Sequence, residues 1–436
     1  MFLATAARRP LVVTLASSGL IQALSIVTGV VLARALGPDL RGELGTAILW
    51  PGIGASLAIL GLPDAVSVLT ARSELTAGDA IRSALPVVAL LAIVAMVAVA
   101  PIDWAVAAGF NATSKSAVAI FLIYIPINIV TLTFAGALSG ARRFGELNAV
   151  RVSVVVVPAV ALPIWALLGR LTVLTAVVTY VAANLVALSM AIVAARRLSR
   201  PQPQRASWSG ARVLLGFGVR SHAGVVAGLI SERLDQLAIS ALLPPRELGL
   251  YLAAITMSAG TGLVSSSITT VLLPTIAAMS PELRLRGMRR YLRLTTLLTA
   301  AIAVATATVA PIVLTALFGA AFEAAGVPAQ ILLAASVPLA LSRSLAAASR
   351  ACGQPGGASK AEWLGLVAGV PAYVMLLPPF GIVGAAGASV VAYSASFLFQ
   401  ANVARSALGA RSVFDLARTG EWERRPLADE PRGASL

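Results

Sequence analysis

The feature that most constrains this chain is a regular alternation of about twelve long apolar stretches with short polar connectors. Apolar residues make up 58% of the 436 residues, charged residues only 12%, and the mean hydropathy is +0.90. A soluble protein cannot bury that much apolar surface, because its exterior must face water. A helix of about 20 residues crosses a hydrocarbon core of about 30 Å. We therefore expect an all-α polytopic membrane protein.

The apolar stretches fall into two groups of six. A polar segment over residues 196–212, with two prolines and five arginines, separates the groups. The sequence thus predicts an N-terminal six-helix bundle over residues 1–195, a cytoplasmic linker over 196–213, a C-terminal six-helix bundle over 214–404 and a cytoplasmic tail over 405–436. The expected spans are 11–33, 44–69, 84–102, 117–139, 151–169, 172–195, 214–242, 249–278, 294–317, 328–350, 361–379 and 382–404.

The basic residues lie mostly on alternate connectors, and this predicts the orientation of the chain. With the N-terminus inside, 26 of the 33 Lys and Arg residues lie on inner connectors and termini, five on outer connectors, and Arg233 and Arg343 within spans. Cytoplasmic connectors carry an excess of Lys and Arg, so both termini are expected in the cytoplasm. Only Lys115 and Lys360 are lysines, which indicates a high-GC bacterial genome and therefore the bacterial cytoplasmic membrane.

The two groups of spans share a repeated outer connector. Leu-Gly-Pro-Asp-Leu-Arg-Gly-Glu-Leu follows the first span and Leu-Pro-Pro-Arg-Glu-Leu-Gly-Leu-Tyr follows the seventh, so that Pro38 aligns with Pro245 and Gly42 with Gly249 at the same offset of 207. Six spans separate the copies, and an even number preserves their direction. Such a repeat predicts two bundles related by a pseudo-two-fold axis along the membrane normal, with a cavity between them. The alternative is two unrelated Pro/Gly turns.

Composition also weighs against several classes of function. The formal charge of +15 would suit nucleic-acid binding, but the basic residues sit at helix ends without interleaved aromatic residues. One cysteine, Cys352, excludes an intramolecular disulfide and a thiolate metal cluster. A single histidine, His222, removes the usual zinc and Ser-His arrangements. We therefore expect no nucleic-acid partner, no metal and no cofactor. The sequence has no Gly-rich phosphate-binding loop with Lys-Ser/Thr, so we also expect no direct ATP hydrolysis.

Several short motifs resemble those of the oligosaccharide flippases of bacterial polysaccharide biosynthesis, within the superfamily that also contains multidrug exporters and lipid II flippases. The resemblance spans nearly the whole chain. Its residues are Ala35-Leu36-Gly37-Pro38 with Gly42, Gly61-Leu62-Pro63, Gly140-Ala141-Arg142-Arg143-Phe144 with Asn148, Phe217-Gly218, Arg233-Leu234-Asp235, Leu243-Pro244-Pro245, Leu248-Gly249-Leu250-Tyr251 with Ala253 and Ala254, and Phe318-Gly319 with Phe322.

The resemblance implies a non-enzymatic protein that moves an undecaprenyl-diphosphate-linked oligosaccharide from the inner to the outer leaflet by alternating access. It implies membrane lipid and the lipid-linked oligosaccharide as binding partners, and a polysaccharide polymerase as a protein partner. One alternative is an ion-coupled exporter of small molecules or drugs from the same superfamily. Another is a membrane enzyme of the polysaccharide pathway, which the short outer connectors disfavour.

Ionisable residues within spans are costly and are therefore candidates for function. The seventh span has the densest group, with Glu232, Arg233 and Asp235. At 100° per residue, Glu232 and Asp235 lie about 60° apart on the helix, whereas Arg233 and Asp235 lie about 200° apart. The two acids are expected on one cavity-facing side, with Arg233 reaching another helix or the outer rim. The alternative role for the group is an interhelical salt bridge.

Arg343 lies well inside the tenth expected span, between two serines. An arginine can hold two phosphate oxygens at once, so Arg343 is a candidate contact for the diphosphate that the resemblance implies. The alternative is a structural ion pair, for which Asp64 in the second span is one candidate partner.

Two arginines near the outer connector of the first bundle and three amide side chains within spans complete the candidates. Arg34 and Arg41 border the outer mouth of the first bundle, where they are placed to receive an anionic headgroup, although loop anchoring is an equal alternative for Arg41. Gln22, Asn128 and Asn184 are uncharged candidates for sugar contacts. Each amide has helix–helix hydrogen bonding as its alternative role.

Overall fold

A computed structural model describes residues 2–198, 208–410, 412, 413 and 415. Part of the expected linker and most of the expected tail therefore lie outside the described residues. Within these ranges the chain is helical and contains no strand. The helices of the first half are α1 (Phe2–Ala58), α2 (Leu62–Ala71), α3 (Ala77–Val106), α4 (Ala112–Phe121), α5 (Tyr124–Gly140), α6 (Phe144–Leu167) and α7 (Val173–Arg196).

The second half begins with α8 (Trp208–Leu242), which carries several ionisable side chains. The elements that follow it are α9 (Pro245–Met257), α10 (Ala259–Ala278), α11 (Pro281–Phe318), the 3₁₀ helix η1 (Ala320–Ala325), α12 (Gly326–Ala351) and α13 (Pro355–Ala407).

The expected twelve crossings are recovered once the longest helices are divided. Eight described helical segments are long and apolar enough to span a bilayer. Two of them, in α1 and α13, are interrupted by a glycine with positive φ, Gly37 (φ 69°) and Gly381 (φ 56°). The bent pair formed by α9 and α10 supplies another crossing. The last is α8, whose 35 residues suffice in length but whose ionisable side chains lower its hydropathy. The chain is thus an all-α multi-pass membrane protein, as predicted.

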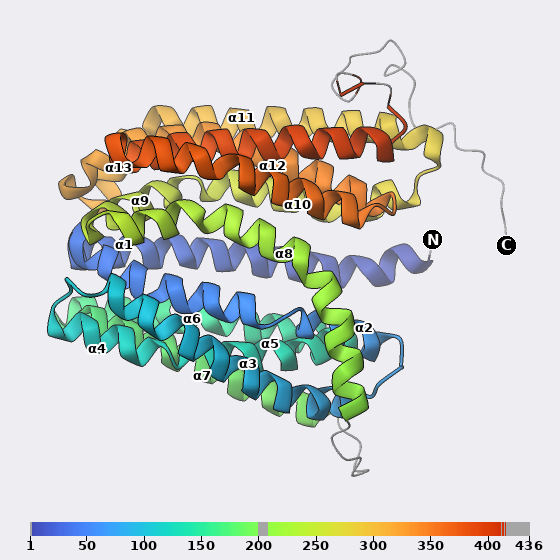
Figure 1. Ribbon diagram of the computed structural model, residues 1–436, viewed down its shortest axis with the longest axis horizontal. Coiled ribbons are helices and arrows are strands. Elements are labelled where there is room, and N and C mark those ends of the chain that lie inside the picture. The colour runs from blue at the N-terminus through green and yellow to red at the C-terminus, as the bar shows by residue number, and fades with distance from the viewer. Residues whose placement is uncertain (1, 199–207, 411, 414, 416–436) are drawn as a thin grey trace.

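The reversal inside α13 is evident from the residues that meet across it. The hydroxyl oxygens of Tyr373 and Ser389 are 3.0 Å apart, and a Cβ placed on Gly365 would lie 2.7 Å from the Cα of Ser396. From one pair to the other, the first residue number falls from 373 to 365 while the second rises from 389 to 396, which is the signature of an antiparallel helical hairpin. In Figure 1 the first part of α1 likewise runs from the N-terminus to the far end of the molecule before the chain returns.

The helices form two lobes, with α1 and α8 between them (Figure 1). The first part of α8 packs on the N-terminal lobe, where Ala211 and Leu214 share a buried cluster with residues of α2 and α3. Its last part packs in the C-terminal lobe, where Ile239 joins a cluster with α9, α11 and α13. The helix α8 is therefore shared by the two lobes.

The two repeated connectors touch each other. A Cβ on Gly42 would overlap the carbonyl group of Pro245, and a Cβ on Gly249 would overlap the carbonyl group of Pro38. A further contact joins Asp39 Oδ2 to Arg246 Nη1 at 3.3 Å. Pro38, Asp39 and Gly42 correspond to Pro245, Arg246 and Gly249 at the repeat offset of 207. This exchange of equivalent contacts is what a two-fold axis between the repeats requires, and it explains why both positions are glycine.

We expect Gly42→Ala to separate the connectors, because the added methyl group overlaps the Pro245 backbone and overpacking of this kind costs about 1–3 kcal/mol. The measurement is thiol cross-linking of Asp39→Cys with Arg246→Cys by a short bifunctional reagent, in a Cys352→Ser background. The cross-linked fraction should fall by roughly tenfold, which corresponds to about 1.4 kcal/mol.

The matched control is Gly52→Ala in the same helix, because a Cβ there would have no atom within 4 Å. It should leave cross-linking unchanged. Equal cross-linking in both alanine variants would show that the connectors do not need the glycine contact.

Candidate substrate-binding site

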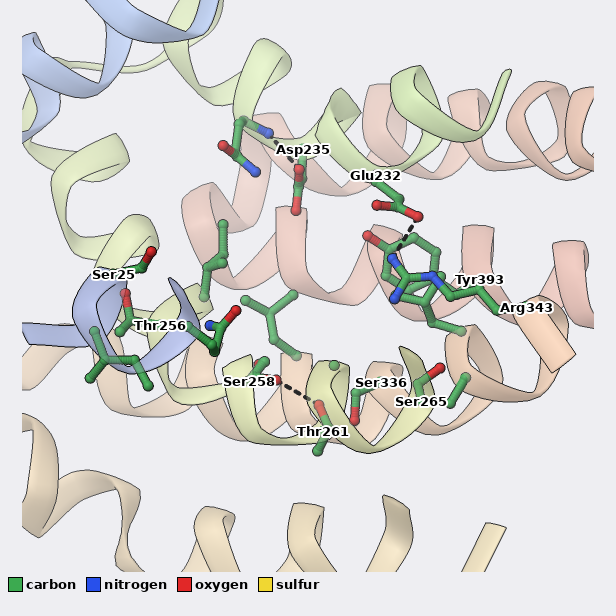
Figure 2. Close-up of a pocket in the computed structure, with 18 residues that line it drawn as sticks. Ser25, Glu232, Asp235, Thr256, Ser258, Thr261, Ser265, Ser336, Arg343 and Tyr393 are labelled. Carbon is green, nitrogen blue, oxygen red and sulfur yellow. Dashed lines mark hydrogen bonds and ion pairs between the residues drawn. The ribbon is translucent and has the colours of Figure 1, made fainter. Parts of the chain in front are cut away.

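A cavity of about 330 Å³ lies within the C-terminal lobe, against the first part of α1. Its wall is formed by α1, α8, α9, α10, α12 and α13. Most of the polar lining consists of amides and hydroxyls (Figure 2). The polar lining residues are Gln22, Ser25, Glu232, Asp235, Gln236, Thr256, Ser258, Thr261, Ser265, Ser336, Arg343 and Tyr393.

An ion pair spans one side of this cavity. Arg343 Nη2 of α12 lies 2.6 Å from Glu232 Oε1 of α8, and the two side chains are 34% and 44% exposed. Partners this exposed are screened by water, so the pair contributes about 1 kcal/mol or less to stability. Arg343 was predicted either to contact the substrate or to form a structural ion pair. The structure shows an ion pair, and its partner is Glu232. The other candidate partner, Asp64, is exposed on α2 in the other lobe.

Asp235 is tied into a hydroxyl network that connects α8, α9 and α13. Its side chain is buried, and Tyr251 donates its hydroxyl to Asp235 Oδ2 at 2.8 Å. The Tyr251 and Ser389 hydroxyl oxygens lie 3.4 Å apart, and the Ser389 hydroxyl lies 3.0 Å from that of Tyr373. Within a bilayer each of these polar groups must find a partner inside the protein, so the network both satisfies the carboxylate and fixes its direction.

Arg233 points away from this cavity, as its angle on the helix predicts. It is exposed, donates from Nη1 to Gln236 Oε1 at 2.9 Å, and does not line the cavity. It lies close enough to Tyr124 of α5 to interact with it electrostatically. Arg233 therefore faces the N-terminal lobe, while Glu232 and Asp235 face the cavity.

The remaining predicted site residues are dispersed. Gln22 lines the cavity. Asn128 is half-buried on α5 and lies outside the lining. Arg34 is exposed outside the cavity and donates from Nε to the Leu317 carbonyl at 2.6 Å and from Nη2 to the carbonyl of Ala316. Carbonyls in the last turn of a helix have no partner within the helix, and a cation can satisfy them. Arg34 does this at the C-terminal end of α11 and so joins α1 to α11.

The cavity-lining hydroxyl residues of α10 and its N-cap, and the tyrosines around Asp235, were missed by sequence reasoning. Ser258, Thr261 and Ser265 follow the i, i+3, i+7 spacing that places side chains on one face of a helix. Their spacing was a usable signal. However, such hydroxyls most often bond to a carbonyl of their own helix, as Thr131 does to Ile127, so the pattern alone does not indicate a cavity.

The fold is similar to that of several solved membrane transporters. The structure is similar to an inward-facing multidrug resistance MATE family transporter of the MOP superfamily, with a TM-score of 0.72, 15% identity, and coverage of 90% of this chain and 96% of that one. It is similar to the lipid II flippase MurJ in an inward closed conformation, with a TM-score of 0.75, 12% identity, and coverage of 92% and 88%. An outward-facing MATE family transporter gives a TM-score of 0.60 at 13% identity, with coverage of 91% and 94%. The chain thus has the two-lobed fold of MOP superfamily transporters.

Residues 8–280 match the family described as Polysaccharide biosynthesis protein, and this is more than half of the chain. The chain belongs to that family. The resemblance inferred from its motifs is therefore confirmed. No curated protein gives a significant sequence match.

We expect Tyr251→Phe to destabilise the folded protein by about 1–3 kcal/mol, because it removes a donor from a buried carboxylate group. Tyr373→Phe is the matched control, since it removes only a bond between two neutral hydroxyls, worth about 0.5–1.5 kcal/mol. Thermal unfolding of both variants in the same detergent measures the difference. If Tyr373→Phe is the more damaging of the two, the Asp235–Tyr251 bond does not hold the network together.

Proposed function

We propose that this protein is a flippase that moves an undecaprenyl-diphosphate-linked oligosaccharide across the bacterial cytoplasmic membrane by alternating access. The observation that carries the proposal is the cavity itself, whose wall of hydroxyls, amides and one ion pair lies inside a helical lobe of a polysaccharide biosynthesis family member. The known activity of the similar flippase, which acts on lipid II, supports the same class of cargo.

The physical need for such a cavity follows from the chemistry of the substrate. Each unbonded hydroxyl of a sugar costs roughly 2–7 kcal/mol to place in an apolar medium. An oligosaccharide carries many hydroxyls, so it crosses hydrocarbon only if a protein replaces the lost water contacts. A cavity lined by hydroxyl and amide groups does this, while the lipid chain remains in the bilayer.

The arrangement of the lobes supports the alternating-access part of the proposal. The repeated connectors touch at one end of the molecule, and the arginine distribution supports our assignment of that end as the outer one. The shape agrees better with an inward-facing relative than with an outward-facing one, with TM-scores of 0.72 and 0.60. A substrate headgroup would enter from the cytoplasm, and the connectors would separate to release it outside, where a polymerase would receive it.

A second candidate is an exporter of organic cations, and one observation favours it. Of the Asp, Glu, Lys and Arg residues in the lining, two are acidic, Glu232 and Asp235, and one is basic, Arg343. Carboxylates in a cavity attract cations, and the similar MATE structures come from multidrug resistance transporters. Drug accumulation in cells with and without the gene separates this candidate from the flippase.

We expect inverted membrane vesicles containing the protein to translocate labelled lipid-linked oligosaccharide, and control vesicles without it to do so far more slowly. Arg343→Ala should lower the rate by at least about tenfold, because a hydrogen bond to a charged group contributes about 1.5–3 kcal/mol. Asp235→Ala should also abolish polymer export in cells. Ser389 remains a partner for Tyr251 in that variant, at 3.4 Å, so folded protein should still accumulate.

The control is Arg170→Ala, in the exposed turn between α6 and α7, which should translocate as the wild type does. Absence of protein-dependent translocation for every native lipid-linked saccharide would remove the flippase proposal. Wild-type export by Arg343→Ala or Asp235→Ala would remove that residue from the site.

A further inference from the structure

The charges around the cavity do not suit the most highly charged part of the proposed substrate. A diphosphate is strongly anionic, but among the described residues the only Asp, Glu, Lys, Arg or His side chains in the lining are Glu232, Asp235 and Arg343. The one cation among them is engaged by Glu232 at 2.6 Å. A diphosphate inside the cavity would therefore lie beside two carboxyl groups with one shared guanidinium.

The opposite wall has a different chemistry. Thr261 and Ser265 lie on one face of α10 together with its N-cap residue Ser258, and Ser258 and Thr261 are across the cavity from Asp235 and Glu232 (Figure 2). The Oγ atoms of Ser258 and Ser265 are buried and have no hydrogen-bond partner among the described residues. A buried hydroxyl without a partner loses its hydration without compensation. A ligand with several hydroxyls of its own would restore the missing bonds.

The cation that the cavity lacks is found on the other side of α8. Arg233 is exposed toward the N-terminal lobe, and Gln236 occupies one of its five N–H donors. Gln236 also lines the cavity. A phosphate bound by Arg233 would thus be separated from a sugar in the cavity by this one glutamine side chain, and the remaining donors of the guanidinium suit two phosphate oxygens at once.

Resting on the flippase function above, we infer that the substrate headgroup is divided across α8. Its uncharged sugar occupies the cavity against the hydroxyl face of α10, and its diphosphate remains outside the cavity at Arg233. The class of cargo follows from this division: glycans whose cavity-bound sugar is neutral are favoured, and those that place a uronic acid there are rejected by Glu232 and Asp235.

The test measures binding of three probes to the full-length protein in lipid nanodiscs. The probes are a polyprenyl diphosphate without sugar, the same lipid carrying a neutral oligosaccharide, and that oligosaccharide with its hexoses replaced by uronic acids. The variants are Arg233→Gln and the double variant Ser258→Ala with Ser265→Ala. The matched controls are Arg170→Gln and Ser349→Ala; Ser349 is also buried with no partner among the described residues but does not line the cavity.

We expect the double serine variant to weaken binding of the neutral oligosaccharide probe by roughly tenfold and to leave the sugar-free probe unchanged. Arg233→Gln should weaken all three probes by a similar factor of roughly 10 to 100. The wild-type protein should bind the neutral probe more tightly than the acidic one. Both controls should bind as the wild type does, and thermal unfolding of each variant shows whether its fold is intact.

The inference is overturned if the serine variant weakens the sugar-free probe as strongly as the neutral one, if Arg233→Gln changes nothing, or if the acidic glycan binds as tightly as the neutral glycan. In each of these cases lipid-linked probes still bind, so the flippase proposal stands. If the wild-type protein binds none of the three probes but binds an organic cation such as tetraphenylphosphonium, the flippase proposal fails and this inference fails with it.

Discussion

The arrangement of the two lobes depends on a backbone contact in which two glycines meet at the repeated connectors. Gly42 and Gly249 bring each connector against the proline carbonyl of the other, a distance that a Cβ on either glycine would prevent. Because equivalent residues exchange these contacts, the junction has the symmetry of the repeat itself. An exposed ion pair between Asp39 and Arg246 adds to the junction. One turn further along α1, Gly45 lies against the side chains of Leu248 and Leu252 of α9, so apolar packing continues from the glycine contact. A rocking motion of the two lobes would have to separate these contacts.

The helix α8 carries the second constraint, which is the need to satisfy ionisable groups inside a bilayer. This helix contacts both lobes, and its two sides carry different ionisable residues. One side gives Asp235 to the tyrosine network and Glu232 to Arg343, and the other turns Arg233 toward the N-terminal lobe. Each acid has a named partner, so the cost of placing it in the membrane is offset locally. The Glu232–Arg343 pair joins α8 to α12 within the C-terminal lobe, so a movement of α8 relative to α12 would break it.

Much of this architecture could be predicted from the sequence, because hydropathy, the arginine distribution and helical angles depend on local residues. The spans, the repeat at an offset of 207 and the opposite directions of Arg233 and Asp235 are of this kind. Tertiary contacts could not be predicted in the same way. Arg34 reads as an exposed cation at a mouth, but it binds carbonyls of α11, 282 and 283 residues away. Asn128 reads as a sugar contact, but it lies on α5 outside the cavity. Tyr251 reads as part of a connector motif, but it supports Asp235.

The division of polar groups across α8 also bears on the energetics of translocation. Two like charges about 4 Å apart repel by about 4 kcal/mol at an effective dielectric constant of about 20. A diphosphate drawn into the cavity would meet this repulsion from Glu232 and Asp235, and it would lose water at the same time. A phosphate held at Arg233, which faces the N-terminal lobe, keeps a cation beside it while the neutral sugar enters the cavity. Hydroxyl groups of the wall can replace hydrogen bonds that the sugar loses with water, so this division desolvates the neutral part of the headgroup and keeps its charged part beside a cation.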